Sequence, residues 1–142
     1  MFLGEYEYKI DPKGRVAIPP RFRGEFWEGI VLARGLERCI IAYPPSLWKE
    51  TAERFDALPI SRSRERRIGR VIFATAFSLE LDEQGRVVLP PSLREHAGIK
   101  ETVVIAGINN YLEIWSKEQW EEEQALMQEQ AWQIAEGMER HQ

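Results

Sequence analysis

The chain has 142 residues, 44% of them hydrophobic and 11% aromatic, which is enough to bury the core of one compact domain and argues against disorder. Its single cysteine, Cys39, cannot form an internal disulfide, and Glu5 and Glu7 stand where a secretory signal needs a basic start, so we expect a cytoplasmic protein. No apolar stretch approaches the roughly 18–20 residues that cross a bilayer, which excludes a membrane span.

The net charge of −4 disfavours a nucleic-acid partner, but the charge is unevenly distributed. Residues 1–78 hold 14 Lys and Arg against 10 Asp and Glu, whereas residues 79–142 hold 5 against 13. Much of the acid lies in residues 116–142, which have two basic and seven acidic side chains. A charge difference between two halves of one chain is typical of an anion-binding face balanced by an acidic segment elsewhere.

The first element in chain order is the stretch DPKGRVAIPPRFR, residues 11–23. Asp11 suits the first position of a tight turn, and Gly14 supplies the left-handed conformation that returns the chain. The flanking segments YKI and RVAIP are therefore predicted to be the two antiparallel arms of one hairpin. Alternation along the second arm places Val16 on its apolar face and directs Arg15 away from that face.

The next segments predict two strands, a helix and a connector. Strands are expected over residues 29–34 and 39–43, followed by an amphipathic helix over about 46–58. The connector, residues 61–78, begins with an arginine run at 62–70 and turns into the apolar segment VIFATAF, which we expect to be a core strand. For the arginine run, a solvated helix end or loop is favoured over direct phosphate contact.

The second half of the chain repeats the first. DEQGRVVLPPSLR, residues 82–94, aligns with residues 11–23 at an offset of 71, and so places Asp82, Gly85 and Arg86 on Asp11, Gly14 and Arg15. Two units indicate a duplication rather than a solenoid.

The elements after this second turn follow the same order as in the first half. A short helix is predicted with Ser92 and Glu95 as a capping pair and Gly98 at its end, and TVVIAG and YLEIW are predicted strands. The Ser116–Gln119 capping pair then begins an amphipathic helix with one apolar stripe, formed by Trp120, Met127, Ala131, Ile134 and Met138.

These elements predict an α+β fold, mainly β, in three parts. Residues 1–60 form the first repeat with its closing helix, residues 61–78 form the arginine-rich connector and strand, and residues 79–142 form the second repeat with its C-terminal amphipathic helix.

The sequence offers poor support for catalysis or for a metal site. Asp11 and Asp82 could share a proton as a catalytic dyad, but each opens a turn, where its carboxylate accepts backbone N–H bonds. His96 and His141 lie far apart with no partner at metal-ligand spacing, and phosphate-loop and nucleophile-elbow motifs are missing. We therefore expect no enzyme activity, no cofactor, no metal and no small-molecule substrate.

The repeated Gly-Arg pair favours binding to DNA. Arg15 and Arg86 could merely form ion pairs with Asp11 and Asp82 across their turns, which for one copy is about as plausible as a ligand contact. The duplication favours a ligand, since a two-stranded ribbon fits the major groove and an Arg on it can bind guanine O6 and N7. Further basic side chains flank the first copy, namely Lys9, Lys13, Arg21 and Arg23.

The two Asp-x-x-x-Arg motifs resemble those of the MraZ family of bacterial transcriptional regulators, and each copy resembles the wider AbrB-type swapped-hairpin domain. MFLGEYEYKID, RVIFATAFSLELD and AGINNYLEIWSKEQW support the resemblance, which covers Met1 to about Met127. It implies that two units interleave into one intramolecular β-barrel with flanking helices. It also implies a ring of subunits that binds short direct repeats in the promoter of its own division and cell-wall operon, as a nucleoid-associated autoregulator, most simply a repressor.

The resemblance assigns residues as well as a function, and its paired motifs fall on Asp11, Arg15, Asp82 and Arg86. Together with the basic residues around the first copy, this predicts DNA contact by Arg15 and Arg86 with Lys9 and Lys13, and phosphate contacts by Arg21 and Arg23. The aspartates of both turns, with Gly14 and Gly85, would orient the arginines.

This sequence departs from the family pattern at two places. Ala74 and Thr75 stand where many relatives have Ser-Gly, and Glu83 and Gln84 stand where the first copy has Pro12 and Lys13. We therefore expect the first turn to dominate DNA contact and the second to serve mainly as its structural partner. An AbrB-type antitoxin, a module that binds a protein, is the alternative, although the C-terminal segment has a helical pattern rather than that of a disordered arm.

Overall fold

A computed structural model describes residues 1–58 and 62–140. Its elements in chain order are β1 (Glu5–Lys9), β2 (Arg15–Ala17), the 3₁₀ helix η1 (Pro20–Phe26), β3 (Ile30–Arg34), β4 (Ile40–Tyr43), α1 (Pro45–Asp56), α2 (Ser63–Gly69), the π-helical turn η2 (Arg70–Ala74), β5 (Phe77–Leu79), β6 (Arg86–Val88), α3 (Pro91–Ala97), β7 (Thr102–Ile108), β8 (Tyr111–Ser116) and α4 (Lys117–Arg140). The expected boundary between residues 60 and 61 and His141 lie outside the described residues.

The strands form an antiparallel six-stranded sheet in the order β1-β7-β8-β4-β3-β5 and a separate two-stranded ribbon, β2-β6. The α+β class is confirmed, although helical residues outnumber strand residues because α4 alone has 24. The expectation of a mainly β chain is therefore corrected. Within the described residues the sheet ends at β1 and β5 and does not close, so the expected barrel is not confirmed.

The two repeats exchange their hairpin arms. The prediction that YKI and RVAIP pair with each other is wrong, because β1 pairs with β7 and β2 pairs with β6 of the second repeat. Val16 lies opposite Val87 at the centre of the β2-β6 ribbon. Beyond the ribbon, the amide of Ile18 donates to Gly85 O at 2.9 Å and the amide of Leu89 donates to Gly14 O at 2.8 Å. A three-residue arm thus obtains its backbone partners from the other copy.

This exchange builds one shared core. The inward residues of both ribbon strands, Val16 and Val87, are no more than 1% exposed and pack in one cluster with residues of the large sheet. Arg15 and Arg86 lie on the other face, as the alternation predicts. Folding of each half therefore depends on the presence of the other.

The predicted helix ends are correct at two places and wrong at one. Gly98 is left-handed, with φ of 66°, and ends α3 as expected. The amide of Gln119 donates to Ser116 Oγ at 3.1 Å, so the predicted cap of α4 is present. Ser92 does not cap α3, because Pro90 occupies the cap position and Pro91 begins the helix.

The connector is helical where a strand was expected. Around the apolar segment VIFATAF, residues 71–77, only Phe77–Leu79 is a strand, and Arg70–Ala74 is a π-helical turn. The reason is packing on α1, since the Phe73 ring lies 5.3 Å from that of Trp48 and 5.1 Å from that of Phe55. The arginine run forms most of α2 and is largely exposed, in agreement with a solvated helix.

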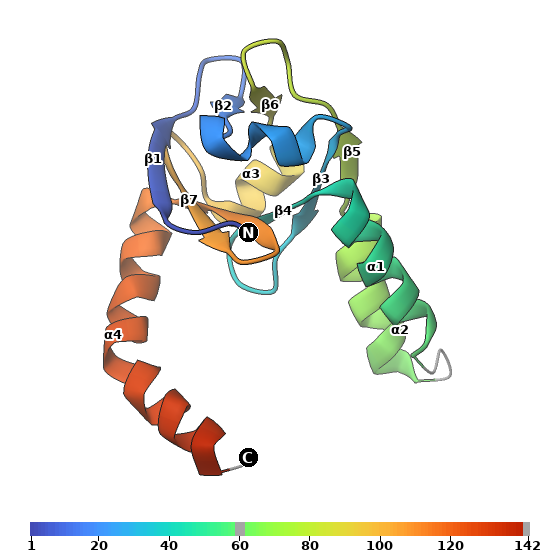
Figure 1. Ribbon diagram of the computed structural model, residues 1–142, viewed down its shortest axis with the longest axis vertical. Helices are drawn as coiled ribbons and strands as arrows, with labels where there is room; N and C mark the ends of the chain where they lie inside the picture. The colour runs from blue at the N-terminus through green and yellow to red at the C-terminus, as the bar shows by residue number, and fades with distance from the viewer. Residues whose placement is uncertain (59–61, 141–142) are drawn as a thin grey trace.

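The molecule has a compact body with two helical extensions at one end. Figure 1 shows the loops before β2 and β6 next to each other at one end, whereas α4 and the α1–α2 pair extend in the opposite direction from opposite edges. Of the predicted apolar stripe of α4 only Trp120 is buried, while Ile134 is 57% exposed. Among the described helices, none is both long and apolar enough to cross a lipid bilayer.

Val87→Ala tests the shared core. It is expected to lower the free energy of unfolding by about 2 kcal/mol, because two buried methyl groups are lost and a cavity is left. Val88→Ala, at the adjacent and 49% exposed position, is the matched control and should change it by less than about 0.5 kcal/mol. Urea unfolding of both variants gives the comparison, and equal effects would contradict the assigned faces.

Candidate nucleic-acid interface

The first turn is organised by the carboxylate of Asp11. Its Oδ1 accepts the backbone N–H groups of Lys13 at 2.9 Å and Arg15 at 2.8 Å, and its Oδ2 accepts Arg15 Nε at 2.6 Å. Gly14 has a φ of 80°, which a residue with a Cβ rarely adopts. The carboxylate therefore holds both the backbone of the turn and the guanidinium of Arg15.

The second turn repeats this geometry. Asp82 Oδ1 accepts the backbone N–H groups of Gln84 and Arg86, both at 2.9 Å, and Oδ2 accepts Arg86 Nε at 2.9 Å. Gly85 has a φ of 76°. The sequence repeat is thus a repeat of local structure.

The two turns form one surface. Arg86 Nη1 lies 3.7 Å from Asp11 Oδ2, so the second arginine also approaches the first aspartate. The side chains of Arg15 and Arg86 are 29% and 28% exposed. Both loops stand at the end of the molecule away from the helical extensions (Figure 1). We call this surface, formed by residues 11–15 and 82–86, the turn face.

Two arginines bind the turns to each other. A Cβ at Gly14 would meet the Arg94 guanidinium at 3.2 Å, and the Arg23 side chain covers Gly85 in the same way. Arg23 Nε also donates to Ile18 O at 3.1 Å. Each arginine thus packs on the turn of the other repeat. Arg94 was missed in the sequence, although its alignment with Arg23 was a usable signal, and the phosphate contact expected of Arg23 stays a prediction.

The remaining basic candidates are exposed around the first turn. Lys9, at the end of β1, and Lys13, in the turn, both point into solvent. Arg21 is also exposed, with Nη1 3.2 Å from the Tyr6 hydroxyl. The second turn carries the exposed Glu83 instead. The positive charge of the turn face therefore lies mainly on its first half.

The electrostatics of the aspartates oppose the catalytic dyad. The backbone N–H of Arg15 holds the pKa of Asp11 below its usual value, and the side chain of Arg15 and the backbone N–H of Lys13 act in the same direction. The backbone N–H of Arg86 lowers the pKa of Asp82 in the same way. A proton-sharing dyad needs one raised pKa, so both carboxylates are ionised hydrogen-bond acceptors instead.

A second group of polar side chains lies away from the turn face. Ligand atoms of Glu37, Cys39 and Glu113 lie within 4.8 Å of one another. Burial raises the pKa of the Cys39 thiol and of the Glu113 carboxyl. Trp115 Nε1 donates to Glu113 Oε1 at 3.1 Å. These shifts favour the protonated thiol and the protonated carboxyl. Cys39 behaves as the small buried hydrophobe expected from the sequence.

The interleaved fold and its two Asp-x-x-x-Arg turns define a tandem swapped-hairpin protein. The family model "MraZ protein, putative antitoxin-like" matches residues 1–71 and again residues 72–140. The chain belongs to the MraZ family.

The relatives support this membership over nearly the whole chain. A protein of Dehalococcoides mccartyi named "Transcriptional regulator MraZ" is 50% identical over 142 residues, covering 99% of this chain and 100% of the relative. Proteins of the same name from Herpetosiphon aurantiacus and Roseiflexus castenholzii are 49% and 46% identical over 121 residues, covering 85% of this chain and 85% of each relative.

The turn carboxylates should make stability depend on pH. Because the folded state lowers the pKa of Asp11 and Asp82, their contribution to stability is complete above the ordinary value of 3.8 and is lost as the pH falls below it. The double variant Asp11→Asn, Asp82→Asn should be less stable than the natural chain at pH 7, and the difference should shrink between about pH 4 and pH 2. Urea unfolding across this range measures it, and a constant difference would contradict the ionised turns.

Proposed function

We propose that this protein is a sequence-specific DNA-binding transcriptional regulator, and that the turn face is its DNA-binding surface. The observation that carries the proposal is the approach of both arginines to one aspartate on a single exposed end of the molecule. The relatives named as transcriptional regulators support the same class of function.

Arg15 is proposed to read base edges. Asp11 holds its Nε, which leaves the terminal nitrogens as the donors for guanine O6 and N7 in the major groove. Because one carboxylate also accepts two backbone N–H bonds of the turn, the guanidinium is positioned before DNA arrives. This preorganisation lowers the entropy lost on binding.

Lys9 and Lys13 are proposed to hold phosphates beside Arg15, with Arg21 and Arg23 as additional contacts. Arg86 is proposed to contact DNA more weakly, since Glu83 repels phosphates near the second turn. Asp82, Gly14 and Gly85 preserve the geometry of the two turns. The first half of the turn face therefore supplies most of the affinity.

One turn face neutralises few phosphates. With a slope of roughly −0.9 in log affinity against log salt for each phosphate, a single subunit would bind poorly at cellular ionic strength. We therefore propose a homo-oligomeric ring whose turn faces contact successive direct repeats, so that weak contacts add through effective concentration. The target is proposed to be the promoter of the chain's own division and cell-wall operon, on the nucleoid in the cytoplasm, and the effect to be autoregulatory repression.

A second candidate is an antitoxin-like module that binds a protein. The words "antitoxin-like" in the family description favour it. The ordered helix α4 disfavours it, because an antitoxin tail of this kind folds on its toxin. Co-purification of a stoichiometric partner would favour this candidate over the regulator.

Arg15→Ala tests the DNA-binding proposal. It should weaken binding to the DNA upstream of the chain's own gene about 5- to 150-fold, because a bidentate arginine–guanine contact is worth about 1–3 kcal/mol. Arg54→Ala removes the same charge from α1, where the side chain is 78% exposed, and should leave binding unchanged. Fluorescence anisotropy gives both affinities, and undiminished specific binding by Arg15→Ala would show that the role is misassigned.

The two halves of the turn face should differ. Arg86→Ala is expected to lower the affinity less than Arg15→Ala does, because Lys9 and Lys13 flank only the first turn. Lys13→Gln should weaken specific and nonspecific DNA alike and reduce the salt slope by about 1 per bound subunit. Titrations at several salt concentrations measure this, and a larger loss from Arg86→Ala would reverse the assignment.

A further inference from the structure

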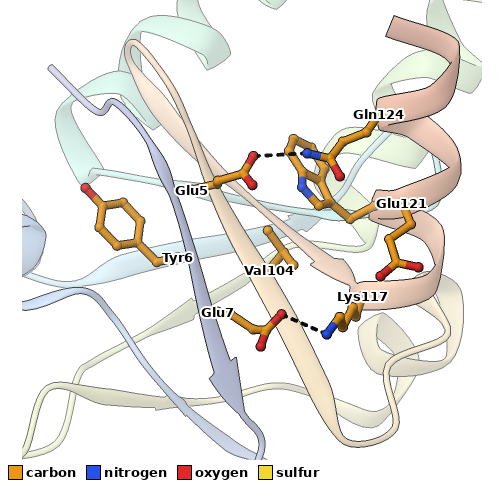
Figure 2. A pocket seen from close by; sticks show the side chains of 8 residues that line it. Glu5, Tyr6, Glu7, Val104, Lys117, Glu121 and Gln124 are labelled. Atoms are coloured by element: carbon orange, nitrogen blue, oxygen red, sulfur yellow. Dashed lines mark hydrogen bonds and ion pairs between the residues drawn. The ribbon is translucent and has the colours of Figure 1, made fainter. Parts of the chain in front are cut away.

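The two halves of α4 have different surroundings. The first turns are anchored to the body, since Trp120 is buried, Lys117 Nζ lies 3.2 Å from Glu7 Oε1, and Gln124 Nε2 donates to Glu5 Oε2 at 3.4 Å (Figure 2). In the later turns the side chain of Trp132 is 71% exposed. Trp132 lies in the second half of a long projecting helix, where its exposed indole offers a large apolar surface to another molecule.

Trp132 stands on an acidic face of α4. Glu129, Trp132, Glu136 and Glu139 follow one another at spacings of three, four and three residues and so share one side of the helix. This side is turned away from the stripe that continues from Trp120. A partner for this face needs an apolar recess for the indole and positive charge around it.

This chain has such a recess on its other helical extension. A hollow of about 390 Å³ lies among α1, α2 and η2, and its surface is almost wholly apolar; its lining residues are Phe55, Arg66, Gly69, Arg70, Phe73 and Ala74. The Phe55 and Phe73 rings lie 5.1 Å apart in its wall. A Cβ at Gly69 would meet the Phe55 ring at 2.5 Å, so the shape of the hollow depends on this glycine. Arg66 of α2 and Arg70 of η2, both among the lining residues, place positive charge at its rim, and further arginines of α2 lie on the same helix.

We propose that Trp132 of one copy inserts into the hollow of a second copy, with the glutamates around it facing the arginines of α2. The inference rests on the self-assembly proposed above and names its two surfaces. The indole would leave water for an aromatic wall, where Arg70 can also stack on its face. The carboxylates would meet guanidinium groups, which form two parallel hydrogen bonds with them.

The occupant is a second copy because the alternatives fit less well. Figure 1 shows α4 and the α1–α2 pair on opposite edges of the molecule, so a chain cannot fill its own hollow. Pairing of α4 with α4 would oppose two segments that each hold seven acidic and two basic side chains over residues 116–142. Docking of α4 on the arginine-rich α2 brings opposite charges together instead.

The docking is head-to-tail, because each copy offers α4 to one neighbour and its hollow to another. Such a heterologous contact closes into a ring when its rotation permits. Both surfaces lie on the extensions away from the turn face (Figure 1), so assembly leaves every turn face accessible.

Light scattering coupled to size-exclusion chromatography of the full chain tests the docking. The natural chain is expected to be an oligomer, and Trp132→Ala should reduce its mass to the 16.6 kDa of one chain. Leu36→Ala removes a comparably exposed apolar side chain, 74% exposed, and should leave the oligomer intact. A monomeric natural chain, or an oligomer unaffected by Trp132→Ala, would overturn the proposal.

A mixing experiment separates this contact from others. Ala74→Trp should block the hollow and Arg70→Glu should reverse its charge, and each should give a monomer with unchanged circular dichroism. A mixture of the Trp132→Ala and Ala74→Trp chains should form pairs and no larger species, because one intact α4 and one intact hollow remain. The docking would be contradicted if either Ala74→Trp or Arg70→Glu still formed oligomers by itself. It would also be contradicted if Ile134→Gln abolished assembly while Trp132→Ala did not.

DNA binding distinguishes this proposal from the function on which it rests. If the Trp132→Ala oligomer has the same mass as the natural one while Arg15→Ala no longer binds the promoter, the docking proposal is wrong and the proposed regulatory function is supported. If Trp132→Ala dissociates the oligomer but Arg15→Ala binds the promoter normally, the docking stands and the assigned DNA contact is wrong.

Discussion

The pairing of β2 with β6 is the interaction on which the rest of this structure depends. Each strand has only three residues, too few to bury a face or satisfy its backbone by itself. By pairing across the repeats they place Val16 and Val87 at the centre of one core. The same pairing brings the two preceding turns together, so stability and the candidate binding surface have one origin.

The turn face shows how a structural ion pair and a binding role can coincide. The carboxylates of Asp11 and Asp82 accept hydrogen bonds from backbone N–H groups and from arginine Nε atoms, which explains their lowered pKa values. Asp11 holds Arg15 through Nε, and the proposed function assigns its terminal nitrogens to an outside acceptor, whereas Arg86 Nη1 lies 3.7 Å from Asp11 Oδ2. Arg23 and Arg94 each pack against the glycine of the other repeat's turn. In the proposed function, the two guanidinium groups of the turn face would confine attraction for DNA to one end of a chain whose net charge is negative.

The charge of the remaining chain is organised around this end. The acidic α4 and the basic α2 both extend away from the turn face (Figure 1). The carboxylates of α4 are therefore distant from the turn face and repel phosphates there less than nearby carboxylates would. Opposite charge on two extensions of one molecule favours contact between copies over contact within a copy. The proposed DNA binding and the proposed self-assembly would thus use separate surfaces of a small protein.

By itself, the sequence determined the duplication, the Asp-x-x-x-Arg turns, strands β3, β4, β7 and β8, and the α+β class. These follow from local requirements: a positive φ at Gly14 and Gly85, apolar and β-branched strand segments between turn residues, and a serine cap before α4. Only the tertiary structure decided which strands pair, that Arg94 supports a turn, that Phe73 belongs to a helical turn on α1, and that the stripe of α4 beyond Trp120 stays exposed. The physical reason is that strand partners and buried faces depend on residues distant in the chain, which local pattern does not specify.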